Sequence, residues 1–173
     1  VHGFFSNPLG YKYFYKCDVD GKTDSISVCI ASEPDVLDPA LNSAVDGATL
    51  DSHLFAGLAK WDTDADGKLE IVADCAESLP EGVVNEDGTV TYTYTLRDGL
   101  KWSDGKDLTA KDFEFAWKRA ASSELGADYG YMFEVVKGYT ADGSDPKAEN
   151  LAVTAVDNKT LTVTLNNPVA YWN

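Results

Sequence analysis

Oxygen-bearing side chains whose spacing could bind a metal ion are concentrated in one short stretch. Asp62, Asp64 and Asp66 alternate with other residues and are followed by Gly67, which is how the calcium loop of an EF-hand begins. The twelfth position of such a loop needs a bidentate glutamate, and it is occupied here by Ala73. The flanking residues also have the patterns of strands rather than helices. We therefore expect an aspartate-rich turn and no metal site.

The residues that could carry out nucleophilic or acid–base catalysis form no recognisable motif. His2 and His53 are the two histidines, and neither lies near a cysteine or serine in a known nucleophile arrangement. The chain has no GxSxG, HExxH or glycine-rich phosphate loop. Carboxylates are abundant, but any acidic protein offers carboxylate pairs by chance. We expect no enzyme activity and no cofactor, with His53 a partly exposed helix residue.

The charge balance excludes one large class of partner. The chain has 173 residues, with 14 lysines and arginines against 29 aspartates and glutamates, which gives a net charge of -15. Nucleic-acid binding needs a basic stripe that neutralises phosphates, and the sequence shows none. We therefore expect no nucleic-acid partner, and we interpret the acidity as a self-repelling, soluble surface. The length is sufficient for one domain with a core of its own.

A strand, two tight turns and a capped helix follow one another in the middle of the chain. Residues 89–96 alternate threonine with large apolar residues, which is the period of a half-buried strand. Turn dipeptides follow at 98–99 and 104–105. Thr109 occupies an N-cap position, with Asp112 as a weaker substitute for the glutamate of a capping box. The helix that follows has an apolar face made of Phe113, Ala116, Trp117 and Ala120.

Shorter elements surround this central block. Helical spacing of apolar residues predicts a helix over 46–59 and a second, short helix over 129–136. The predicted strands are 25–30, two short strands within 61–72, and a hairpin over 153–165 that turns at Asp157 and Asn158. Together these elements predict a mixed α+β fold, in which a small sheet carries flanking helices.

The central block also resembles the signature of a known family. Between Leu96 and Arg119 the chain follows the order LRxGxKWSDGxxLTAxDFxxAWxR, which looks like that of the extracytoplasmic solute-binding proteins of oligopeptide, dipeptide and nickel ABC transporters. Supporting stretches lie in the family's order. They are SEPDVLDP from Ser32, LFAGL from Leu54, the hairpin over 153–165 and the proline-aromatic stretch 167–172. ADCAES, from Ala73, departs from the family pattern at Cys75.

This resemblance implies the fold and the extent of the domain. Members of the family have a bilobed, type II periplasmic-binding-protein fold, in which hinge closure traps the ligand between two lobes. Residues 25–173 are similar to the N-terminal subdomain, and the second ligand-binding lobe is absent. Residues 1–24 have no counterpart and stay unassigned. We expect such a fragment to bind its ligand weakly.

The resemblance also implies a ligand and candidate contacts. The family's typical ligand is an extended oligopeptide held largely through backbone hydrogen bonds. The matching positions here are the loop residues Ser32, Glu33, Pro34 and Asp35, and the aromatic residues Tyr129 and Tyr131. Glu33 is a conceivable partner for a peptide amino terminus, and a tyrosine can stack on a peptide plane. The alternatives are a solvated loop carboxylate at Glu33 and packing of the short helix by the tyrosines.

The remaining expectations concern location and partners. Members of the family lie outside the cytoplasm, are usually lipid-anchored and deliver ligands to an ABC permease in the membrane. In that environment Cys29 and Cys75 could pair, although buried free thiols are the favoured alternative. Nickel, haem, an oligosaccharide or a signalling peptide remain alternative ligands. A surface interaction module without a transport role is the alternative of a different class.

Overall fold

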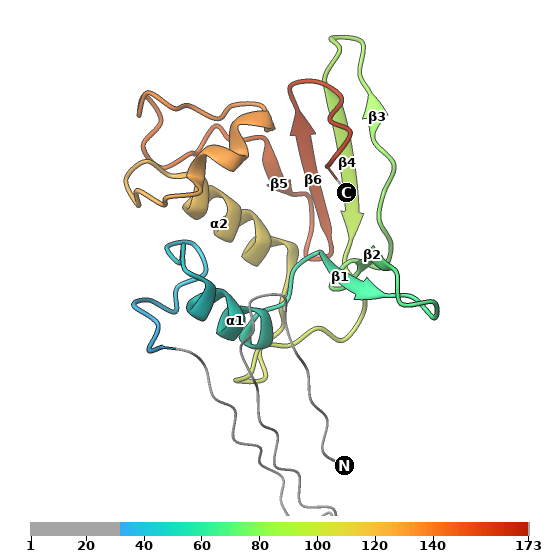
Figure 1. Ribbon diagram of the computed structural model, residues 1–173. Coiled ribbons are helices and arrows are strands. Elements are labelled where there is room, and N and C mark those ends of the chain that lie inside the picture. Colours follow the sequence, from blue (N-terminus) through green and yellow to red (C-terminus); the bar gives the residue numbers. More distant parts are fainter. Residues whose placement is uncertain (1–31, 173) are drawn as a thin grey trace, which may run out of the picture.

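The computed structural model describes residues 32–172 as two small sheets with three helical segments (Figure 1). The unassigned residues 1–24 and the strand predicted at 25–30 lie outside the described residues. The helical segments are α1 (Val45–Leu54), α2 (Ala110–Ala121) and the 3-10 helix η1 (Gly130–Val135). The strands are β1 (Ala59–Thr63), β2 (Leu69–Ala73), β3 (Val83–Val84), β4 (Val90–Thr95), β5 (Val153–Ala155) and β6 (Thr160–Leu165).

The larger sheet is antiparallel and has the strand order β3-β4-β6-β5. Strand β4 pairs with β6 from Val90 opposite Leu165 to Thr95 opposite Thr160. The alternation predicted for 89–96 is confirmed, because its apolar side chains are buried: Val90, Tyr92, Tyr94 and Leu96. Threonines lie opposite threonines on the other face, where they form cross-strand pairs. The pairing thus separates an apolar face from a hydroxyl-rich face.

Helix α2 covers the apolar face of this sheet and supplies the rest of the core (Figure 1). Its capping box is confirmed, because the Asp112 carboxylate accepts hydrogen bonds from the backbone N–H and hydroxyl of Thr109 at 2.7 and 2.9 Å. The first helical N–H, from Ala110, reaches the carbonyl of Asn158 in the β5–β6 turn. On the predicted apolar face, Phe113 is buried against the sheet, whereas Ala116 is exposed.

The predicted helix over 46–59 is wrong at its C-terminal end. Helix α1 ends at Leu54, and Phe55 is already extended at φ -122° and ψ 154°. Leu58 is buried, but from an extended segment, where its carbonyl accepts hydrogen bonds from the N–H groups of Asp74 and Ala76. The helical spacing that included Leu58 was therefore coincidental. Pairing of this segment with a distant stretch outcompetes local helix propensity.

The aspartate-rich stretch forms the turn of a separate β1–β2 hairpin, as predicted. The Asp64 carboxylate accepts hydrogen bonds from the N–H groups of Asp66 and Lys68 at 2.9 and 2.8 Å. Gly67 has a φ of 81°, which favours glycine over other residues. Within residues 32–172, no group of three or more histidine, cysteine, aspartate or glutamate side chains gathers in a way that could bind a metal ion.

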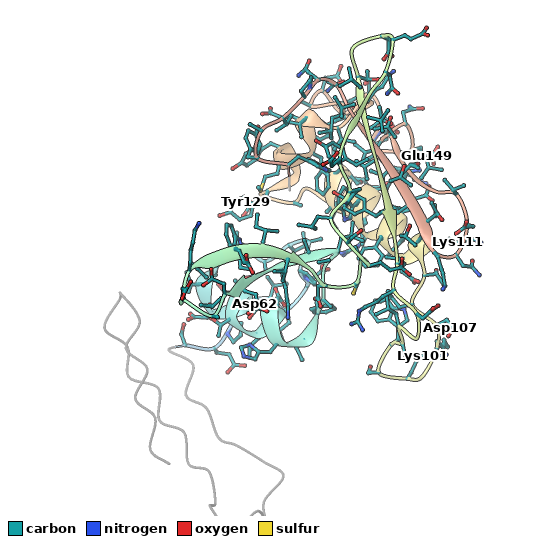
Figure 2. All side chains as sticks on the ribbon, turned by 90° about the vertical axis from the view of Figure 1, so that its right-hand side faces the viewer. Asp62, Lys101, Asp107, Lys111, Tyr129 and Glu149 are labelled. Carbon is teal, nitrogen blue, oxygen red and sulfur yellow. The ribbon has the colours of Figure 1, made fainter. Side chains whose placement is uncertain are left out.

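The turns before α2 have the expected architecture. Lys101 and Asp107 lie opposite one another across the second turn, joined by an ion pair and an isolated antiparallel bridge (Figure 2). Gly105, at a φ of 86°, allows the chain to reverse between them. The predicted second short helix and the 153–165 hairpin are also present, as η1 and β5–β6.

A two-pronged ion pair ties the segment before α1 to helix α2. The guanidinium of Arg119 donates hydrogen bonds to the two carboxylate oxygens of Asp38 at 2.8 and 2.5 Å. This hydrogen bonding to Arg119 lowers the pKa of Asp38 below its ordinary value. Bidentate geometry of this kind fixes the orientation of both partners. The pair therefore anchors the stretch that begins at Ser32.

The last described residues return to the core. Trp172 packs against Tyr92 and Trp117, with ring centroids 5.8 and 5.9 Å apart, and its indole N–H donates a hydrogen bond to the Tyr94 hydroxyl at 3.0 Å. Burial raises the pKa of Tyr94 to about 12, although the bond from Trp172 opposes part of the increase. These contacts hold the C-terminal segment against strand β4 and helix α2.

Two further findings bear on the expectations above. Cys75 is a buried free thiol whose pKa is raised by that burial, and Cys29 lies outside the described residues. Among residues 32–172, none of the helices has the length and apolar character required to cross a membrane.

The Asp38→Asn substitution tests the anchoring ion pair. A depressed carboxyl pKa stabilises the fold above the ordinary pKa of aspartate, and this contribution is lost as the pH falls through the folded-state pKa. Because both side chains are about one-third exposed, we expect the variant to lose only about 1 kcal/mol in free energy of unfolding at pH 7. Urea denaturation should show this difference shrinking toward pH 2.5. Asp66→Asn, at an exposed turn carboxylate, is the control, and an equal difference at both pH values would contradict the prediction.

The Tyr94→Phe substitution tests the buried hydroxyl. A tyrosine pKa near 12 in the fold, against about 10 in the unfolded chain, makes the unfolded state release its proton first as the pH rises. Stability is then fully present below pH 10 and declines toward pH 12, by about 2 to 3 kcal/mol in total. The free energy of unfolding, measured by denaturation at several pH values between 9 and 12, should fall less steeply with pH for the variant than for the parent chain. Tyr131→Phe, which changes an exposed tyrosine, should show the same pH dependence of the free energy of unfolding as the parent chain.

Candidate functional site

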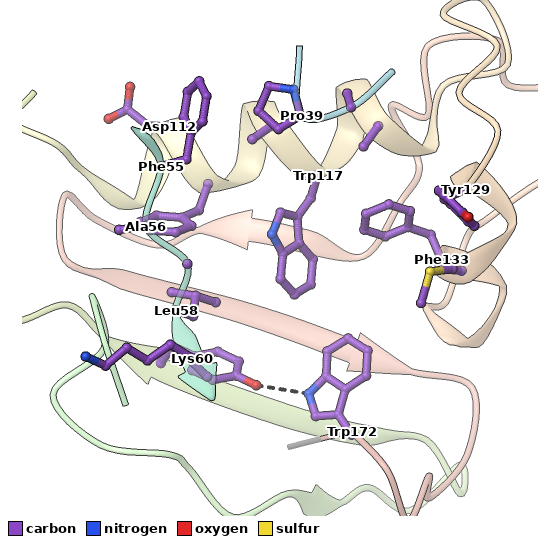
Figure 3. Close-up of a pocket in the computed structure, with 18 of the residues that line it drawn as sticks. Pro39, Phe55, Ala56, Leu58, Lys60, Asp112, Trp117, Tyr129, Phe133 and Trp172 are labelled. Carbon is purple, nitrogen blue, oxygen red and sulfur yellow. Dashed lines mark hydrogen bonds between the residues drawn. The ribbon is translucent and has the colours of Figure 1, made fainter. Parts of the chain in front are cut away.

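An apolar groove of about 730 Å³ lies between helix α2 and the segment from Phe55 to Trp61 (Figure 3). Helix α2 forms one wall through Trp117 and its neighbours, and the stretch from Phe55 to Trp61 forms the facing wall. Phe133 from η1 and Trp172 from the C-terminal segment close the end of the groove around Trp117. The groove thus gathers aromatic side chains from parts of the chain that are far apart in the sequence.

The chemistry of this groove favours apolar contact over catalysis. Its only charged lining side chains, within the described part of the chain, are Lys60 and Asp112. Asp112 is already used by the cap of helix α2, where it accepts two hydrogen bonds from Thr109. No nucleophile, base and orienting group meet here in the way that a catalytic constellation requires. The groove can therefore accommodate apolar surface, but it offers few directional polar contacts.

Three of the carboxylates with lowered pKa values lie in turns, and none of the three lines the groove: Asp87, Asp142 and Asp157. Hydrogen bonds from Thr89, with a further one from Lys137, lower the pKa of Asp87 to about 2. The backbone N–H of Ser144 lowers the pKa of Asp142, and that of Lys159 lowers the pKa of Asp157. Each of these carboxylates bonds to N–H groups two residues further along the chain, as in an Asx-turn. Their pKa shifts are explained by turn architecture.

The two predicted tyrosines lie together on the surface of η1. Tyr129 and Tyr131 have ring centroids 6.2 Å apart, and their side chains are 49% and 57% exposed. Packing of the short helix is performed by other residues, because Phe133 contacts Trp117 and Val136 is fully buried. The backbone beyond η1 is tied to β6 by hydrogen bonds from Lys137 to Thr164 and from Asn166 to Val135. The tyrosines thus stand on a firmly attached element with their rings free to meet a partner.

The predicted loop at the start of the described chain is also on the surface. Ser32, Glu33 and Asp35 are exposed and Pro34 is half-buried. The Ser32 hydroxyl donates a hydrogen bond to the Asp46 carboxylate of helix α1. None of these four residues lines the apolar groove, whereas Tyr129 does and Tyr131 does not. The described residues do not unite the loop and the tyrosines in one cavity, so a joint ligand site stays a prediction.

The groove itself was missed by reasoning from the sequence. Its signals were present in the apolar face of helix α2 and in the aromatic pair Tyr171 and Trp172. Trp61 was a third signal, because it lies opposite Ile71 in the β1–β2 hairpin and both side chains line the groove. These residues were assigned to a helix face, to the proline-aromatic stretch and to a strand, because nothing in a linear pattern shows which apolar faces remain uncovered.

Comparison with known proteins agrees with these features. The family model for bacterial extracellular solute-binding proteins, family 5, middle part, matches residues 70–173, which is more than half of the chain. The oligopeptide-binding protein OppA of Bacillus subtilis is 38% identical over 159 residues, which is 91% of this chain and 27% of that protein. A dipeptide-binding protein of Lactococcus lactis is 35% identical over 137 residues, or 73% of this chain and 24% of that protein.

Solved structures extend the similarity to three dimensions. Haemophilus influenzae OppA in complex with the peptide RPPGFSPFR superposes with a TM-score of 0.66 at 33% identity, covering 81% of this chain and 26% of that one. This chain therefore spans about a quarter of the length of the relatives that it matches. The mixed helix and sheet architecture agrees with the expected α+β class and with the periplasmic-binding-protein likeness. The chain belongs to family 5 of the bacterial extracellular solute-binding proteins.

Proposed function

We propose that this chain is part of a receptor that captures oligopeptides outside the cytoplasm and delivers them to an ABC permease. The observation that carries the proposal is its similarity, at 33–38% identity over most of its length, to an oligopeptide-binding protein and to one solved with a peptide. The surface of η1 supports it, because it displays two exposed tyrosines on an anchored element. Family membership makes binding rather than catalysis the expected activity.

The proposed contacts follow from the chemistry of a peptide. An extended peptide presents the same backbone donors and acceptors whatever its sequence, so a receptor that uses them accepts many peptides. The Glu33 carboxylate is exposed and negatively charged, which suits the ammonium group of a peptide amino terminus. Tyr129 and Tyr131 supply flat rings for stacking and hydroxyls for hydrogen bonds. Ser32, Pro34 and Asp35 place backbone groups beside Glu33.

The second half of the site lies in polypeptide beyond this chain. We assign residues 25–173 to one subdomain of a bilobed receptor and leave residues 1–24 unassigned. Closure of a second lobe over the peptide would complete the site and prepare it for the permease. If a complete site binds at micromolar affinity, near -8 kcal/mol, a half-site with half of that free energy binds at roughly millimolar affinity. Lipid anchoring on the extracytoplasmic side of the membrane fits this role.

Nuclear magnetic resonance titration of the labelled 173-residue chain tests the proposal. We expect trialanine to cause saturable shifts at Glu33, Tyr129 and Tyr131 with a dissociation constant of about 1 mM, because only half of the contacts are present. Tyr131→Ala should weaken this binding several-fold. Phe115→Ala is the matched control, because it removes an exposed aromatic ring of helix α2 that does not line the groove.

A modified ligand tests whether Glu33 contacts the amino terminus of the peptide. Acetylating the amino terminus of trialanine removes the positive charge that Glu33 is proposed to meet. Glu33→Gln should therefore weaken binding of free trialanine and leave binding of acetylated trialanine unchanged. Equal effects on both ligands would exclude the amino-terminus contact. No peptide response up to 20-fold above the expected constant of about 1 mM, or a response to an oligosaccharide alone, would refute peptide capture.

A further inference from the structure

One face of the molecule, formed by helix α2, strand β5 and the β5–β6 turn, is basic although the chain as a whole is acidic. Two depressions lie on this α2–β5 face, and they adjoin because Lys111 and Ala155 line both. Their linings contain five of the chain's 14 basic residues but only two of its 29 acidic residues, Glu114 and Asp157. The five basic residues are Lys111, Lys118, Arg119, Lys147 and Lys159. The local charge is therefore opposite in sign to the net charge of the chain.

Two of these five basic residues have no carboxylate partner. Three others are neutralised within the fold, in the pairs Lys118–Glu114, Arg119–Asp38 and Lys159–Asp98. Lys111 and Lys147 form no ion pair with any residue of 32–172. Glu114 is already used, because its carboxylate also accepts a hydrogen bond from the backbone N–H of Ala155 at 2.9 Å. Two ammonium groups on this face are thus available to an anionic partner.

Exposed apolar side chains lie among these lysines. Phe115 is 68% exposed and lines the same depression as Lys111 and Lys147, and Val156 is 63% exposed and lines the adjoining one. Lys111, Phe115 and Lys118 are spaced four and three residues apart, so they project from one side of helix α2. Surfaces that lie on anionic membranes have this composition, because lysines meet the headgroups while apolar side chains enter the interfacial layer.

The acidity of the rest of the chain does not prevent such a contact. At physiological ionic strength the Debye length is about 8 Å, so more distant exposed carboxylates are largely screened at this face. Figure 2 shows Lys111 at the edge of the molecule opposite Tyr129 and Asp62, which places the aspartate-rich turn on the other side. Glu149 lies on the same side as Lys111, but it lines neither depression. The local charge therefore decides what this face attracts.

We propose that the α2–β5 face docks on the anionic headgroups of a phospholipid membrane, with Lys111 and Lys147 at phosphate groups and Phe115 in the interfacial layer. An acidic protein would match the lysines, whereas a membrane interface accommodates the apolar side chains as well. An electrostatic contact of this size is weak alone and acts together with a covalent lipid anchor, which supplies the second signal for stable attachment.

Docking in this orientation would leave the proposed peptide-binding surface accessible. Tyr129 lies on the side opposite Lys111, so a membrane beneath the α2–β5 face would not cover it (Figure 2). Membrane docking goes beyond peptide capture and does not depend on it. The two activities can therefore be measured separately in the same chain.

Co-sedimentation of the 173-residue chain with lipid vesicles tests the proposal. At physiological salt we expect half of the chain to bind vesicles of phosphatidylglycerol and phosphatidylcholine at about 1 mM accessible lipid. Vesicles of phosphatidylcholine alone should bind none. Lys111→Gln and Lys147→Gln should each weaken binding about five-fold, because each lysine near an anionic surface contributes roughly that factor. Lys68→Gln is the matched control, since it removes another lysine without an ion pair from outside both depressions, and it should change binding by less than about two-fold.

Two further variants separate membrane contact from damage to the fold. Phe115→Ala should weaken vesicle binding and leave the binding of trialanine unchanged, because the ring lies outside the proposed peptide contacts. Glu149→Gln removes an exposed carboxylate on the same side as Lys111 and should strengthen vesicle binding. Loss of structure cannot produce such a gain.

Several outcomes would overturn the proposal. These are equal binding to neutral and anionic vesicles, or no binding at lipid concentrations up to 20-fold above the expected value of about 1 mM. An equal loss in Lys68→Gln and Lys111→Gln would show that the net charge, and not this face, governs binding. Nuclear magnetic resonance shifts at Lys111 and Lys147 with inorganic phosphate, without vesicle binding, would identify a site for soluble anions instead. Failure of trialanine to bind would leave the vesicle result unaffected, so the two proposals fail independently.

Discussion

The pairing of β4 with β6 is the constraint on which the rest of the structure depends. Its register places every large apolar side chain of both strands on one face and every threonine on the other. One face must then be covered, and helix α2 and Trp172 cover it. A shift of one residue would move all these side chains to the opposite face, so the alternation specifies the register strongly. Helix α2 and Trp172 pack where they do because this register leaves an apolar face that must be covered.

Most local elements could be predicted from the sequence because their causes are local. The alternation of 89–96, the capping box at Thr109 and Asp112, and the aspartate-rich turn each involve residues within a few positions of one another. The end of helix α1 could not be predicted, because Leu58 is held by backbone groups of Asp74 and Ala76. That competition between local propensity and distant pairing is invisible in a linear pattern.

The candidate site likewise has features that could be predicted from the sequence and features that could not. The exposed tyrosines and the loop at Glu33 were found through a resemblance, whereas the groove depends on segments far apart in the sequence meeting in space. Ala116 illustrates the difference, because it belongs to the predicted apolar face of helix α2 and the structure leaves it exposed. Apolar periodicity shows that a face must be covered, but it does not show whether the cover belongs to the same part of the chain. The two surfaces meet at Tyr129, which lines the groove, whereas Tyr131 does not.

The edges of the larger sheet limit how a peptide can be recognised. Edge strand β3 has two residues and edge strand β5 has three, and β5 lies against helix α2. Such short edges expose few unpaired backbone groups, which protects the sheet from edge-to-edge association. They equally prevent a peptide from joining the sheet as an added strand, which is a common mode of recognising extended peptides. In the receptor proposed above, a peptide would therefore find most of its backbone partners away from the β3 and β5 edges, so the larger sheet would act as a support and not as a template.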